Sequence, residues 1–139
     1  MDERVRIEIP NIPEALAPAN AQAEEWSEAH DVPPKVTYLL LLAMEELVTN
    51  CIAYGYDDAD RHIISVELEI AAGVLSITVM DDGHAFNPLA MAAPDLTVEV
   101  AQRSIGGLGI HMLRQMSDTI TYERVDGTNR VMLTKSIAS

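Results

Sequence analysis

The chain has 139 residues, of which 48% are hydrophobic, and it contains a single cysteine. This length suits one folded domain that buries roughly two-thirds of its unfolded surface, and one cysteine excludes an internal disulfide and fits a reducing compartment. The formal net charge of −13 argues against nucleic acid and anionic membrane surfaces as partners, because both repel an acidic protein.

Hydropathy predicts neither a secretory signal nor a membrane span. Residues 1–4 lack the basic and then apolar pattern of a signal peptide. The longest apolar run, residues 38–44, is far shorter than the about 20 residues that cross a bilayer. We therefore expect a soluble, cytoplasmic protein.

The first half of the chain predicts a strand followed by two helices. Apolar and charged residues alternate over residues 5–9, which is typical of a strand with one buried face. Residues 14–30 favour a helix, and Pro33-Pro34 mark the start of the next one. Residues 35–54 form the strongest helical pattern in the sequence.

The second half predicts two hairpins separated by a loop and a helix. Alternating residues 64–70 and 75–79, joined by a short link, indicate an antiparallel hairpin. Residues 87–104 read as a loop with a short helix at 98–103, followed by a helix from the glycine-rich segment to about residue 116. A last strand pair surrounds the Asp126-Gly127 turn.

No repeat or linker divides the sequence, so residues 1–139 are expected to form a single domain. Segregated long helices and mostly antiparallel strands indicate the α+β class. We expect a two-layer sandwich in which a mixed, mostly antiparallel sheet is covered on one face by helices.

The long helix carries a carboxylate and a carboxamide on one face. Glu46 and Asn50 are four residues apart, whereas Glu45 lies about 140° around the helix from Asn50 at 3.6 residues per turn. A carboxylate can accept a proton, and an amide oxygen can ligate Mg²⁺. Taken alone, the pair better suits an exposed Glu and Asn on a solvated helix face.

Two further segments suit nucleotide binding, and a third has a turn motif. Asp81-Asp82-Gly83 ends a strand, where a fixed carboxylate can accept the amino hydrogens of a purine and a glycine lets a ring approach the backbone. Residues 106–109 (Gly-Gly-Leu-Gly) open a helix, whose free N–H groups attract phosphate. Asp126-Gly127-Thr128 is by itself an ordinary hairpin turn.

The four histidines show no ligand spacing with Cys51, so structural or surface roles are expected. No serine lies in the setting of a hydrolase nucleophile. The histidines are His30, His62, His84 and His111.

The order of the motifs is more specific than any one of them. Residues 46–50 resemble the N box of the ATPase superfamily that contains gyrase, mismatch-repair proteins and histidine kinases. Residues 81–86 resemble its G1 box, residues 105–110 its G2 box, and Gly127-Thr128 its terminal Gly-Thr. The resemblance covers about residues 36–135 and implies the histidine kinase-like ATPase, or Bergerat, fold. Within the superfamily the chain looks most like the anti-sigma-factor serine kinases, because it is a minimal domain with a short segment between the G1 and G2 boxes.

The resemblance implies a role for each matching residue. Glu46 would be the general base for a substrate serine, and Asn50 would ligate Mg²⁺ with bound ATP. The other implied contacts are Asp81 and Gly83 at the adenine, Gly107, Leu108 and Gly109 around the phosphates, Arg103 at a phosphate, and Thr128 at the adenine end.

The resemblance also implies protein partners. The kinase would phosphorylate a serine of a small anti-sigma factor antagonist and would bind a sigma factor when the antagonist is phosphorylated. Homodimerisation is common in the family, although no segment of this sequence marks a dimer surface. Tyr54 stands where many of these kinases carry a histidine, which leaves kinase efficiency and partner choice open.

Two other functions remain open. An ATP-dependent regulatory module could sequester a partner without phosphorylating it, although such a module needs no base at Glu46. A detached histidine-kinase catalytic domain would need a helical hairpin with a phosphoacceptor histidine, and only about 30 residues precede the long helix.

Overall fold

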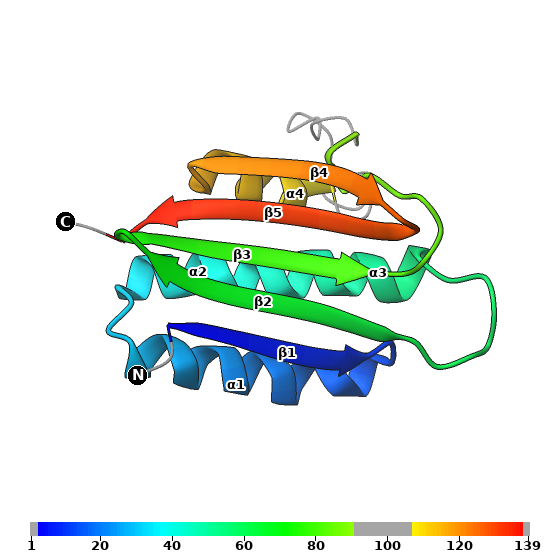
Figure 1. Cartoon of the computed structure of the whole chain (residues 1–139), viewed down its shortest axis with the longest axis horizontal. Helices are drawn as coiled ribbons and strands as arrows, with labels where there is room; N and C mark the ends of the chain where they lie inside the picture. The colour runs from blue at the N-terminus through cyan, green and yellow to red at the C-terminus, as the bar shows by residue number, and fades with distance from the viewer. Residues whose placement is uncertain (1–2, 91–106, 138–139) are drawn as a thin grey trace.

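The computed structural model describes residues 3–90 and 107–137, in which one sheet is covered on one face by helices (Figure 1). The strands are β1 (Arg4–Pro10), β2 (Ile63–Ala71), β3 (Val74–Asp81), β4 (Thr119–Val125) and β5 (Thr128–Ser136). The helices are α1 (Leu16–Ala29), α2 (Pro34–Ala43), α3 (Thr49–Tyr54) and α4 (Gly107–Met116), with the short turns η1 (Pro13–Ala15), η2 (Met44–Val48) and η3 (Pro88–Ala90). The expected α+β two-layer sandwich is therefore confirmed.

The sheet has the order β1-β2-β3-β5-β4, and all four of its pairings are antiparallel. We expected a mixed, mostly antiparallel sheet, but the described strands contain no parallel pair. Tight hairpins account for two of these pairings. Ala72 and Gly73 turn with φ of 53° and 75°, and Asp126 and Gly127 with φ of 51° and 77°, so both turns have the left-handed central residues of a type I′ hairpin.

The predicted long helix is continuous from Pro34 to Tyr54, but it contains one irregular turn. The segment η2 is a π-helix, which winds more residues into a turn than an α-helix does. By length and composition this helix could cross a membrane, a property shared by core helices of soluble proteins. Here Leu39, Leu40 and Met44 are buried beneath the sheet, as expected for a core helix.

The core lies between the helices and the facing side of the sheet. On β3, the side chains of Leu75, Ile77 and Val79 are buried in alternation, and Asp81 continues the same alternation at the strand end. On β5, Asn129 lies on this helix-facing side, and the strand register pairs it directly with Asp81. The apolar core therefore ends in a polar pair beneath α3.

Most predicted elements match the structure within one or two residues. The expected helix at residues 98–103 lies outside the described residues, as do Arg103 and Gly106. The part of the loop that the structure describes contains η3.

Candidate active site

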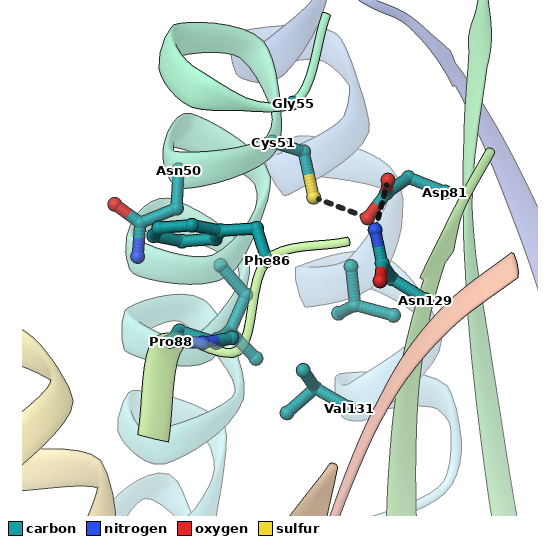
Figure 2. Close-up of a pocket in the computed structure, with 10 residues that line it drawn as sticks. Asn50, Cys51, Gly55, Asp81, Phe86, Pro88, Asn129 and Val131 are labelled. Atoms are coloured by element: carbon teal, nitrogen blue, oxygen red, sulfur yellow. Dashed lines mark hydrogen bonds between the residues drawn. The ribbon is translucent and has the colours of Figure 1, made fainter. Parts of the chain in front are cut away.

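A small hollow, open to solvent on one side, lies between the end of the long helix and the helix-facing side of the sheet. Asn50 and Cys51 line it from α3, Asp81 from β3 and Asn129 from β5, and Phe86 extends into it from the loop after β3 (Figure 2). The hollow therefore collects polar groups from three elements around an otherwise apolar wall, as ligand sites do.

Asp81 is the central acceptor of this hollow. Its side chain is only 8% exposed. Oδ1 accepts hydrogen bonds from the backbone N–H of Gly83 at 2.9 Å and from Nδ2 of Asn129 at 3.0 Å. Oδ2 accepts a hydrogen bond from the thiol of Cys51 at 3.2 Å (Figure 2). The carboxylate is thus held in one orientation by donors from three directions.

Cys51 acts here as a donor. Burial raises the pKa of its thiol well above the usual value, and the negative charge of Asp81 and the hydrogen bond to it raise this pKa further. A protonated thiol is a poor nucleophile and a weak hydrogen-bond donor. The chemistry of the site therefore does not use Cys51 as a nucleophile.

Asn129 connects the strand end to the neighbouring loop and strand. It is 3% exposed, and Nδ2 donates to Asp81 and, at 2.8 Å, to the carbonyl of His84. Its Oδ1 accepts from the hydroxyl of Tyr122 at 2.5 Å and from the guanidinium of Arg124 at 2.9 Å. Every polar atom of the amide is satisfied, so Asn129 fixes the position of Asp81.

Sequence reasoning placed Thr128 at this site and missed Asn129. Successive residues of a strand point to opposite faces. Thr128 lines a hollow on the helix-free face of the sheet, beside Arg130, whereas Asn129 faces the helices. The structure therefore does not bring Thr128 to the Asp81 hollow. Asn129 lies two residues before the apolar Val131, so the alternation of a strand places both on the buried face. That pattern could have identified Asn129 from the sequence.

Two glycines make a close backbone approach beside Asp81. The N–H of His84 donates to the carbonyl of Gly55 at 2.9 Å. A Cβ on Gly83 would overlap that same carbonyl. Gly83 is therefore required to be a glycine for packing reasons, because the carbonyl of Gly55 occupies the space that a side chain would need.

Asn50 carries an unpaired polar atom into the same hollow. The residue is 6% exposed, and its Nδ2 has no hydrogen-bond partner within the described residues. Buried amides are nearly always hydrogen-bonded, so an unpaired one at a hollow is typical of a group whose partner is a ligand.

Glu46 lies one turn before Asn50, against the first turn of α4. A Cβ on Gly109 would overlap the Glu46 carboxylate, so the two residues are in close contact. Burial raises the pKa of Glu46, and the neighbouring charge of Glu45 raises it further. Glu45 itself is exposed. The carboxylate that contacts α4 is therefore that of Glu46, and its action together with Asn50 stays a prediction.

The glycine-rich segment is described from residue 107 onward. Gly107, Leu108 and Gly109 form the first turn of the ten-residue helix α4. Leu108 is 41% exposed, and Gly109 is buried against Glu46. The N–H groups of this first turn and the positive end of the helix dipole lie at the Glu46 end of the site.

Aromatic and histidine side chains brace the loops around the hollow. Tyr54 packs on Phe86 with ring centroids 5.8 Å apart. His62 stacks on Tyr56 at 4.3 Å, and its ring bonds Asp58 at 2.9 Å. The hydrogen bond to Asp58 is the main cause of a raised pKa of His62. This arrangement agrees with a structural role for His62.

Comparison with known proteins adds a family match to this geometry. A family model described as the histidine kinase-like ATPase domain matches residues 9–135. The serine/threonine-protein kinase BtrW of Bordetella bronchiseptica is 24% identical over 118 residues, which are 85% of this chain and 79% of that protein. An anti-sigma F factor of Clostridium novyi is 32% identical over 106 residues, which are 70% of this chain and 68% of that protein.

The fold also matches a solved structure, that of the RsbU and RsbW domains of Rv1364c from Mycobacterium tuberculosis. The TM-score is 0.71 at 18% identity, and the match covers 98% of this chain and 33% of the solved chain. This chain thus spans a third of that protein, and the likeness supports the fold alone.

Proposed function

Because the chain belongs to the histidine kinase-like ATPase family, we propose that it binds Mg-ATP in the Asp81 hollow and transfers the γ-phosphate to a serine of a small partner protein. The observation that carries the proposal is the position of Glu46. Its half-buried carboxylate, with a raised pKa, lies against Gly109 in the first turn of α4. Nucleotide binding alone needs no such base, whereas removal of a proton from a hydroxyl does.

The Asp81 end of the hollow suits adenine. The carboxylate accepts hydrogen bonds and is fixed in orientation, so it can accept the 6-amino group of a purine. The N–H of Gly83 fixes Oδ1 of this carboxylate, and the close approach of Gly83 to Gly55 holds the loop in place beside it. Val79 and Val131 supply apolar wall for the faces of that ring.

The opposite end suits phosphates and a magnesium ion. The first turn of α4 offers free N–H groups to phosphate oxygens. The described residues contain no cluster of three histidine, cysteine or acidic side chains that could hold a metal alone. Mg²⁺ commonly takes most of its ligands from phosphates and water, and the side-chain oxygen of Asn50 would supply the remaining ligand. The unpaired Nδ2 of Asn50 would donate to a phosphate oxygen. The ion would neutralise charge on the phosphates.

The proposed reaction is an in-line displacement. The serine oxygen forms a bond to the γ-phosphorus while the bond from that phosphorus to the β,γ-bridging oxygen breaks, and ADP leaves. Glu46 accepts the proton of the serine hydroxyl. Such transfer depends mainly on positioning and charge neutralisation, so these few groups suffice.

The proposed partners follow from the relatives. Proteins named anti-sigma F factor and serine-protein kinase RsbW are 32% and 28% identical to this chain. We infer that the substrate of this kinase is an antagonist protein. In its unphosphorylated form the antagonist competes with a sigma factor for the kinase. A cytoplasmic location, where both would be present, is part of the proposal.

Labelled phosphate transfer tests the proposal. The purified protein is incubated with Mg²⁺, γ-labelled ATP and a soluble extract of the source organism. A small labelled protein that contains acid-stable phosphoserine is expected. ATP binding without any labelled protein, also when a purified candidate antagonist is supplied, would favour the regulatory module that binds a partner without phosphorylating it.

Gly109→Ala is expected to lower the transfer rate without destabilising the domain. The added methyl group would displace the Glu46 carboxylate, which is the mobile end of a side chain. Alanine in a helix is otherwise about 1 kcal/mol more favourable than glycine. Phosphotransfer assays together with thermal unfolding check this, and an unchanged rate would show that the contact with Gly109 does not position Glu46.

A further inference from the structure

The carboxylate of Asp81 has few acceptor positions left for a ligand. A carboxylate offers about four lone-pair positions, two on each oxygen. Oδ1 already accepts two hydrogen bonds, from Gly83 and Asn129. Oδ2 accepts one, from Cys51. One position on Oδ2 therefore remains for a donor that enters the hollow.

The side chains that fill these positions come from opposite sides. Cys51 belongs to α3 and Asn129 to β5, and both line the hollow together with the unpaired amide of Asn50 (Figure 2). Asn129 is itself fixed by Tyr122 and Arg124. The carboxylate is consequently unable to rotate without breaking at least one of these bonds.

We propose that Cys51 and Asn129 are positioning residues that leave Asp81 able to accept one donor only, and that this selects a purine with a 6-amino group. The inference rests on the proposed function, in which the hollow holds the base of a nucleoside triphosphate. An adenine amino group supplies the single donor that the free position of Oδ2 can accept.

The same geometry disfavours guanine. The 6-carbonyl of guanine is an acceptor and would face the lone pairs of Oδ2. The N1–H and 2-amino donors of guanine would need two free acceptor positions, one on each carboxylate oxygen, but Oδ1 of Asp81 is filled. An unpaired buried donor or acceptor is costly, so a base that leaves one is rejected.

The test compares ATP with purine riboside triphosphate, which differs only by lacking the 6-amino group. Dissociation constants for both, and for GTP, are measured by calorimetry in the wild-type protein and in Cys51→Ala and Cys51→Ser. We expect the wild-type protein to bind ATP about tenfold more tightly than either other nucleotide. Cys51→Ala should weaken the binding of ATP about three- to tenfold. It should weaken the binding of purine riboside triphosphate by less than about twofold. Cys51→Ser keeps a donor and should restore the preference.

Each outcome bears on a distinct claim. Equal weakening of both nucleotides by Cys51→Ala would show a merely structural role and overturn the inference, as would no weakening of either. Equal wild-type affinities for ATP and the amino-free nucleotide would overturn it without any variant. A wild-type protein that binds no nucleoside triphosphate would instead refute the proposed function.

Discussion

Glu46→Gln is expected to slow phosphoryl transfer about 10²–10⁴-fold, while ATP affinity changes by less than about twofold. Glutamine keeps the size and polarity of the side chain against Gly109 but cannot accept the serine proton. The measurement is the rate of labelled phosphoserine formation at saturating ATP, with ATP binding measured separately by calorimetry.

Glu45→Gln is the matched control. It removes the same charge from the adjacent, exposed residue, which points away from Asn50. Its maximal transfer rate should equal that of the wild-type protein. Transfer by Glu46→Gln at the wild-type rate would refute the role of Glu46 as the base.

The pH dependence gives a second measure of the same role. The base must be ionised, so transfer should rise with pH through the pKa of Glu46, which burial and then Glu45 raise above the usual value for glutamate. Removal of the Glu45 charge lowers this pKa, so Glu45→Gln should shift the acidic limb of the rate profile to lower pH. An acidic limb at the same pH in both proteins would assign it to another group.

Asn129→Ala is expected to destabilise the domain by about 2–4 kcal/mol and to weaken ATP binding. The substitution would leave Oδ1 of Asp81 short of a hydrogen bond in a buried setting, and it would remove a partly buried bond from the carbonyl of His84 and another from the guanidinium of Arg124. Urea unfolding followed by circular dichroism measures the loss of stability.

Thr128→Ala provides the comparison for Asn129→Ala. Thr128 lies on the helix-free face of the sheet, away from the Asp81 hollow. Its substitution should change the free energy of unfolding by less than about 1 kcal/mol and leave ATP binding unaltered. A larger effect on ATP from Thr128→Ala than from Asn129→Ala would restore the role that the sequence motif implied for Thr128.

Much of the fold was predictable because its elements carry strong local patterns. Two hairpins have alternating strands and left-handed turn residues, and the long helix has an uninterrupted apolar face. The position of Asp81 also followed from pattern, since it continues the alternation of Leu75, Ile77 and Val79. Residue spacing along the long helix led to Glu46 rather than Glu45, and the contact of Glu46 with Gly109 agrees with that choice without testing its role.

Contacts between distant segments were harder to predict from the sequence. The π-turn at η2 has no signature in the sequence, because its residues continue the apolar pattern of the long helix. The Cys51–Asp81 and Asn129–Asp81 bonds join residues 30 and 48 positions apart. Their existence depends on the strand register and on how α3 packs over the sheet. The motif Gly127-Thr128 led to Thr128 because motif matching does not specify which strand face a residue occupies.

Every role proposed above requires that Mg-ATP bind in the Asp81 hollow. Calorimetric titration of ATP, with and without Mg²⁺, into the wild-type protein, Asn50→Ala and the exposed-residue control Thr49→Ala tests this most directly. We expect Mg²⁺ to strengthen ATP binding at least about tenfold in the wild-type and control proteins, and Asn50→Ala to lose most of that gain, because the side-chain oxygen of Asn50 is the proposed protein ligand of the ion. Absence of ATP binding by the wild-type protein, or the same Mg²⁺ dependence in Asn50→Ala, would contradict the account.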